Sequence, residues 1–142
     1  MRYVVIGGFA VAAHGVVRAT ANLDVVVERS WENSARMVGA LEAMGARDVE
    51  EPDLTLTQEV LVPRADRRFE TAHGQLQVLH EVSGVPSYAE LAPGDLIEMA
   101  GGQVAVATLD ALRSMKRAAG RDKDRVDLAE LDALHGEDAE RE

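Results

Sequence analysis

The segment of residues 3–27 constrains the fold of this chain more than any other part, because two apolar runs flank a glycine turn. The first run, YVVI, ends at Gly7-Gly8, and the second run is LDVVV. Continuous β-branched runs of this length predict short buried strands. Between them, the Ala-rich residues 9–14 precede Gly15, which predicts one short helix. The segment therefore predicts a strand, a tight turn, a short helix and a second strand.

One carboxylate, Asp24, lies inside the second apolar run. Side chains two residues apart point to the same face of a strand, so we expect Asn22 and Asp24 to face the same way. A buried carboxylate costs free energy unless it is paired or holds a metal ion. Asp24 is therefore either a structural ion-pair partner, for example of Arg18, or part of a functional site. The glycine turn is likewise either a plain turn or a backbone cradle for an anion.

The rest of the chain predicts helices alternating with hairpins. The expected elements are a helix over 31–44 capped by Ser30, an irregular stretch over 46–58, hairpins over 67–82 and 96–107, one helical turn over 88–91, and helices over 109–119 and 123–134. This order predicts an α/β or α+β domain over residues 1–135, with a small mixed sheet and a C-terminal helical pair. An acidic tail over 136–142 follows.

Composition excludes several classes of protein. The 142 residues carry a net charge of −10, which argues against a broad nucleic-acid-binding surface. The chain has no cysteine, so disulfides, thiolate zinc sites and cysteine nucleophiles are excluded. No apolar run approaches the roughly 20 residues of a membrane span. The N-terminus also lacks the pattern of a signal peptide, so we expect a cytoplasmic protein without a membrane partner.

Three downstream motifs, taken with the N-terminal segment, allow this chain to be compared with a known protein family. The stretch VVIGGFAVAAHGVVRATANLDVVV is followed by GQLQVL at 74–79, by GVPSY at 84–88, and by a Lys- and Asp-rich helix junction at 116–128. Together these motifs resemble the DNA polymerase beta-type nucleotidyltransferase superfamily, in particular small bacterial proteins related to abortive-infection toxin nucleotidyltransferases. The resemblance spans nearly the whole chain. Relatives usually have a helix before the first strand, whereas this chain begins almost on the strand.

The resemblance implies a minimal nucleotidyltransferase fold and a site for a nucleoside triphosphate. In the family, three carboxylates hold two divalent metal ions that stabilise charge during an in-line displacement. The glycine turn and a basic residue on a later helix contact the triphosphate. By this resemblance, the nucleotide- and phosphate-binding residues are Gly7, Gly8, Arg18, Thr20, Lys116 and Arg121.

The catalytic positions of the family match this chain unevenly. Asp24 matches the second carboxylate and is the implied metal ligand, but the first and third positions hold Asn22 and Gln77. An amide oxygen can ligate a hard cation, yet it supplies no negative charge. We therefore expect Mg²⁺, the cofactor implied by the resemblance, to bind weakly at best. Glu70 is the best alternative acid, because Glu28 and Glu81 lie four residues, or about 13 Å, along the strands from Asp24 and Gln77.

Lys116 lies beside the apolar stripe of its helix, which leaves two interpretations. It is either a lysine that snorkels at the edge of the core or a lysine that faces phosphate. Arg121 and Lys123 can add positive charge at the same helix junction. Asp124 and Asp127 either pair with these cations or cap the last helix.

Three functions are open on the sequence alone. The first is a nucleotidyltransferase-like protein, a pseudoenzyme or nearly so, that recognises a nucleoside triphosphate with weak or lost transferase activity. The second is a non-catalytic protein-interaction module of a toxin–antitoxin-like or regulatory pair. The third is an active nucleotidyltransferase with a rearranged metal site. The nucleotide, the acceptor and the protein partner are not specified by the sequence.

Overall fold

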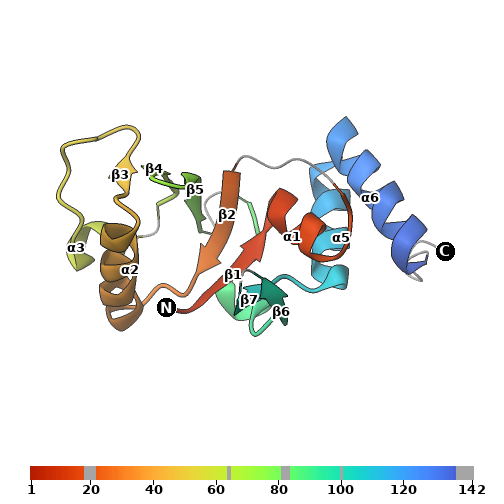
Figure 1. The fold of residues 1–142 in the computed structure, drawn as a ribbon, viewed down its shortest axis with the longest axis horizontal. Coiled ribbons are helices and arrows are strands. Elements are labelled where there is room, and N and C mark those ends of the chain that lie inside the picture. Colours follow the sequence, from red (N-terminus) through yellow and green to blue (C-terminus); the bar gives the residue numbers. More distant parts are fainter. Residues whose placement is uncertain (18–21, 64, 81–83, 100, 137–142) are drawn as a thin grey trace.

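The computed structural model describes residues 1–17, 22–63, 65–80, 84–99 and 101–136. Over these residues, a seven-stranded mixed sheet is accompanied by six helices (Figure 1). The elements are β1 (Tyr3–Ile6), α1 (Gly7–Ala13), β2 (Asn22–Val27), α2 (Trp31–Ala43), β3 (Arg47–Asp48), α3 (Gln58–Leu61), β4 (Arg67–Thr71), β5 (Gly74–Leu79), α4 (Tyr88–Leu91), β6 (Asp95–Met99), β7 (Gly102–Val106), α5 (Leu109–Ala119) and α6 (Asp122–His135). No helix in the described ranges is long and apolar enough to cross a membrane.

The sheet has the strand order β3-β4-β5-β2-β1-β7-β6. The N-terminal unit forms its centre, because β1 pairs antiparallel with β2 and parallel with β7. The two predicted hairpins are confirmed as the antiparallel pairs β4–β5 and β6–β7. Helices α5 and α6 pack together at one end of the molecule, and α2 and α3 lie at the other end (Figure 1). The predicted mixed sheet with a C-terminal helical pair is confirmed.

The register divides the sheet into two unlike faces. Strands β2 and β5 are parallel, and Asp24 lies opposite Gln77, just as Asn22 lies opposite Gln75. Arg68 of β4 lies opposite Gln77 on the other side. Residues opposite one another in a ladder share a face, so these five residues define what we call the polar face.

The other face of the sheet, the apolar face, builds the main core. Phe69, Leu76 and Val78 lie on it and form one buried cluster with Met37 and Leu41 of α2. Such alternation along β4 and β5 sets the register, because a slip of one residue would move the buried side chains into solvent. Burial of the apolar face therefore keeps the polar side chains of β2, β4 and β5 on the opposite, polar face.

The prediction of an irregular stretch over 46–58 was wrong in part, because the stretch contains β3 and the first residue of α3. Asp48 stabilises β3 by accepting hydrogen bonds from two backbone N–H groups of the following turn. Its other carboxylate oxygen accepts a hydrogen bond from Arg67 of β4 at 2.8 Å. Because that partner is distant in sequence, local patterns do not indicate the strand.

Candidate functional site

Gly7 and Gly8, predicted as a turn ahead of the helix, are instead the first two residues of α1, and we keep the name glycine turn for this pair. The pair meets the carboxylate of β2 where β1 ends. Ile6 lies opposite Asp24 in the antiparallel β1–β2 ladder. Gly7 follows with φ of +71°, a conformation that L side chains rarely adopt. A Cβ atom on Gly7 would lie 2.7 Å from Asp24 Oδ2, so only glycine permits this contact. Gly7 and the Asp24 carboxylate therefore lie directly against each other.

Substitution of Gly7 by alanine should lower the free energy of unfolding by about 2 kcal/mol, through strain at positive φ and the clash with Asp24. Urea denaturation monitored by circular dichroism measures this loss. The matched control is Gly39→Ala in α2, where a Cβ atom would meet nothing within 4 Å. The control should be neutral or stabilising by up to about 1 kcal/mol. Equal stability of the two variants would contradict the tight contact.

Asp24 lies in an environment that disfavours its charge. Burial raises the pKa of the Asp24 carboxyl, and the positive charges of Lys116 and Lys123 offset this effect only in part. Its Oδ1 atom is buried without a hydrogen-bond partner among the described residues. Arg18, the partner considered from the sequence, and Thr20 both lie outside the described residues, so their predicted roles stay predictions.

A pocket of about 160 Å³, which we call the Asp24 pocket, joins the glycine turn to the C-terminal helices. Its lining residues come from β1, α1, β2, β5, the GVPSY loop, α5, the α5–α6 junction and α6: Ile6, Gly7, Asp24, Leu79, Val85, Leu112, Met115, Lys116, Arg121 and Asp124. Of the predicted site residues, the structure therefore brings Gly7, Asp24, Lys116 and Arg121 together. These residues are far apart in sequence, and α5 carries Lys116 to the sheet.

The cations of the Asp24 pocket are held by two carboxylates of α6. Lys116 Nζ lies 3.1 Å from Asp124 Oδ1 and 2.9 Å from Asp127 Oδ2. Arg121 Nε lies 2.7 Å from Asp124 Oδ2. The side chain of Lys116 is only 10% exposed, so this lysine does not extend into solvent as a snorkelling lysine does. Asp124 pairs with Arg121, as one of the two interpretations predicted. It also caps α6 by accepting a hydrogen bond from the Arg121 backbone N–H at 3.2 Å, as the other interpretation predicted.

Asp124 is the centre of this network. It is fully buried and accepts hydrogen bonds from both Lys116 and Arg121. Burial by itself would raise its pKa, but these hydrogen bonds outweigh burial and hold the pKa of Asp124 at about 2. The carboxylate is therefore charged at neutral pH and fixes the positions of both cations.

A second hollow continues the site along the polar face. It has a volume of about 240 Å³ and is lined by Asn22, Arg68, Gln75, Leu76 and Gln77. We call it the amide groove, because three of its five residues are side-chain amides. Asn22 and Gln77, which the sequence places at metal positions, lie here, and Asp24 lies opposite Gln77 in the ladder. The sequence did not indicate Arg68, because only the register of β4 with β5 brings it here.

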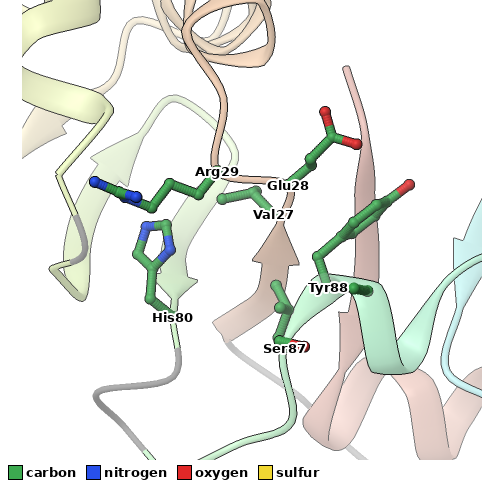
Figure 2. Close-up of a pocket in the computed structure, with 8 residues that line it drawn as sticks. Val27, Glu28, Arg29, His80, Ser87 and Tyr88 are labelled. Atoms are coloured by element: carbon green, nitrogen blue, oxygen red, sulfur yellow. The ribbon is translucent and has the colours of Figure 1, made fainter.

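A separate pocket of about 330 Å³ lies near the carboxyl ends of β2 and β5 (Figure 2). Figure 2 shows His80 and Arg29 on one wall and Tyr88 on the opposite wall. Sequence reasoning missed this pocket, because its walls come from the end of β2, the end of β5 and the start of α4. No residue of the Asp24 pocket lines it.

The acids considered as replacement metal ligands do not complete the site. Glu28 lines the pocket of Figure 2, about 13 Å along β2 from Asp24, and Arg2 NH1 contacts it at 3.0 Å. Glu81 lies outside the described residues. Glu70 lies opposite Gln75 in the β4–β5 ladder, two strand spacings or about 10 Å from β2.

Comparisons with known proteins agree with this architecture. No family model and no curated protein matches the sequence. The solution structure of the antibiotic-resistance factor ANT(2'')-Ia is similar with a TM-score of 0.57 and 17% identity, over 94% of this chain and 74% of that chain. The crystal structure of ANT(2'')-Ia in complex with adenylyl-2''-tobramycin has a TM-score of 0.61 and 17% identity, over 99% of this chain and 82% of that chain.

The protein has a nucleotidyltransferase fold. At this level of identity the likeness establishes the fold alone, and the chemistry of the site has to be judged from its own residues.

The side chains at the expected metal-binding positions do not fit the two divalent ions that the resemblance implies. Asp24 supplies one carboxylate, and burial raises its pKa. Asn22 and Gln77 supply neutral amides, which leave a divalent charge uncompensated. Within the described ranges, no three His, Cys, Asp or Glu side chains gather where a metal ion could bind. Lys116 and Arg121 are the cations that line this pocket, and each is paired with a carboxylate of α6.

Proposed function

We propose that this protein is a nucleotidyltransferase-like protein that binds a nucleoside triphosphate in the Asp24 pocket, with weak or lost transferase activity. The observation that carries the proposal is the contact of Gly7 with Asp24 beside Lys116 and Arg121. A glycine turn leaves room for phosphate oxygens close to the backbone. The two cations supply charge complementary to phosphate, and Asp124 holds them in place.

The weakness of the transfer step follows from the same residues. With amides at Asn22 and Gln77, the site lacks the charge that concentrates divalent cations beside the reacting phosphate. Lys116 and Arg121 can orient and neutralise phosphate oxygens, but they do not activate an acceptor hydroxyl. The name of the similar complex makes tobramycin the first acceptor to test.

The test is calorimetric titration with ATP, GTP, CTP and UTP, in Mg²⁺ and in EDTA. At least one nucleotide should bind, with an affinity that changes less than about threefold between the two conditions. Arg121→Gln should weaken binding about tenfold, the effect of a lost charged hydrogen bond. The matched control is Arg125→Gln, because Arg125 lies one turn along α6 and is 73% exposed.

Two outcomes would contradict the proposal in different ways. Binding that strictly requires Mg²⁺ would show that the metal site is functional, which favours the active enzyme with a rearranged site. If none of the four nucleotides binds, the protein-interaction module becomes the better-supported function.

The interaction module is favoured by one observation, an apolar hollow of about 360 Å³ on the apolar face of the sheet. Its lining residues are all apolar: Met1, Tyr3, Val5, Phe9, Leu23, Val25, Met44, Leu76, Val104 and Val106. Apolar side chains that stay accessible to solvent mark interaction surfaces, and here they are Met1, Tyr3, Phe9 and Leu23 at the rim of the hollow. Under this second proposal, Leu23→Lys abolishes binding of a partner protein and leaves nucleotide affinity unchanged.

A further inference from the structure

The Asp24 pocket is too small to hold a whole nucleotide. Its volume of about 160 Å³ lies below the roughly 300–1,000 Å³ typical of small-molecule sites. A ligand anchored there must continue onto a neighbouring surface. The amide groove, of about 240 Å³, lies on the face of the sheet that Asp24 shares with Gln77. The ligand therefore continues across Gln77 toward β4.

We propose that the amide groove is an anion subsite in which Arg68 binds a phosphate or another anionic group of the ligand. This inference rests on the proposed function, because it assigns the groove to the ligand that the Asp24 pocket anchors. The anionic group belongs either to the nucleotide itself or to the acceptor beside it.

The sheet register places Arg68 within reach. Asp24, Gln77 and Arg68 form one line across β2, β5 and β4. Neighbouring strands are about 4.8 Å apart, so the Arg68 backbone lies about 10 Å from that of Asp24. The long Arg68 side chain lines the groove between them. An anion above Gln77 therefore meets the guanidinium group on one side and the Asp24 pocket on the other.

Charge at Arg68 supports binding of an anion. Arg68 makes no ion pair with any carboxylate in the described part of the chain, although the chain carries an excess of acids. Its neighbour Arg67, on the other face, is paired with Asp48 at 2.8 Å. A carboxylate at position 77, as in the family pattern, would lie opposite Arg68 as an ion-pair partner. The neutral Gln77 offers Arg68 no such partner.

The chemistry of the groove matches phosphate better than a metal ion. A guanidinium group donates two parallel hydrogen bonds to phosphate or carboxylate oxygens. The amide NH₂ groups of Gln75 and Gln77 are further donors. A neutral amide at Gln77 is thus compatible with an anion subsite, whereas a carboxylate there would repel the anion.

The experiment compares wild type with Arg68→Gln in EDTA, using ATP, AMP and inorganic tripolyphosphate as probes. If the subsite binds the nucleotide, Arg68→Gln should weaken ATP and tripolyphosphate binding about tenfold and AMP binding less. If it binds the acceptor, Arg68→Gln should spare ATP and weaken inorganic phosphate binding to the ATP-saturated protein. Arg68→Lys keeps the charge and should restore part of the affinity. Arg36→Gln, at an exposed residue of α2, is the matched control and should change nothing.

Failure of the subsite and failure of the proposed function give different results. If wild type binds ATP and Arg68→Gln equals wild type in every titration, the subsite is wrong and the nucleotide proposal stands. If no nucleotide binds but tripolyphosphate does, and Arg68→Gln weakens it, the subsite stands and the nucleotide proposal fails. If wild type binds none of the probes, both are overturned. Circular dichroism of each variant confirms that the exposed substitutions leave the fold intact.

Discussion

Replacement of Asp124 by asparagine should lower the free energy of unfolding by about 3 kcal/mol, among the largest effects of any single substitution in this chain. Asp124 is fully buried and pairs with both Lys116 and Arg121. Removing one partner of a buried pair leaves the remaining charge uncompensated in a medium of low polarity. Asp127 still contacts Lys116, so the protein should fold, but with Lys116 and Arg121 displaced. Urea denaturation measures the loss of stability, and nucleotide titration measures the loss of affinity.

The Asp124 carboxylate also predicts that the free energy of unfolding depends on pH in the acidic range. The pKa of Asp124 is about 2 in the folded protein, below its ordinary value of 3.8. A carboxyl whose pKa is lowered by folding binds fewer protons in the folded state, so stability falls as pH falls. The contribution of Asp124 is therefore complete above about pH 4 and is lost as pH decreases toward 2. Asp124→Asn should show a shallower loss of stability in this window.

The control for Asp124 lies in the same helical turn. Asp122 is fully exposed and lies 3.6 Å from Arg125. Asp122→Asn should cost no more than about 1 kcal/mol, through the helix dipole and a surface ion pair. If Asp124→Asn and Asp122→Asn had equal effects, the buried network would not be what holds α5 against α6.

The double substitution Asn22→Asp with Gln77→Asp should create a divalent-cation site. Asp24 lies opposite residue 77 in the parallel ladder, and Asn22 lies on the same face of β2 as Asp24. Three carboxylates at this position repel one another, so without metal the variant should be less stable than wild type. Mg²⁺ at a hundredfold excess over its dissociation constant should then raise stability by about 2.7 kcal/mol. Thermal unfolding with and without Mg²⁺ measures the response.

A charge-matched control separates a metal site from a general salt effect. Asn22→Asp with Gln103→Asp adds the same charge, but residue 103 is exposed on β7, on the far side of β1. This control should not respond to Mg²⁺, nor should wild type. If Mg²⁺ does not stabilise the Asn22→Asp, Gln77→Asp variant, the two amides are not the only difference between this site and a metal site. Combination with Arg68→Gln should strengthen the response, because Arg68 lies opposite residue 77.

The sequence by itself determined the local units of this protein. The apolar runs specify β1 and β2, and the Ala-rich residues between them specify α1, because period and propensity act over a few residues. The start of α1 differs from the prediction, since the helix begins at Gly7 and not after the glycine pair. Thr108 and Gly120 likewise bound α5 as predicted, through an N-cap hydrogen bond and a left-handed C-cap. The strand alternation also placed Asn22 and Asp24 on one face.

Only the tertiary structure decided which distant residues meet. The register of β5 on β2 sets Gln77 opposite Asp24, and that of β4 on β5 adds Arg68. The packing of α5 against α6 similarly gives Lys116 its two carboxylate partners. The physical reason is that strand register and helix packing follow from burial of whole faces, which sums contributions from many separate segments. Local sequence patterns can identify the candidate residues of such a site. Packing of the whole core determines which residues they contact, and these contacts determine their charge state.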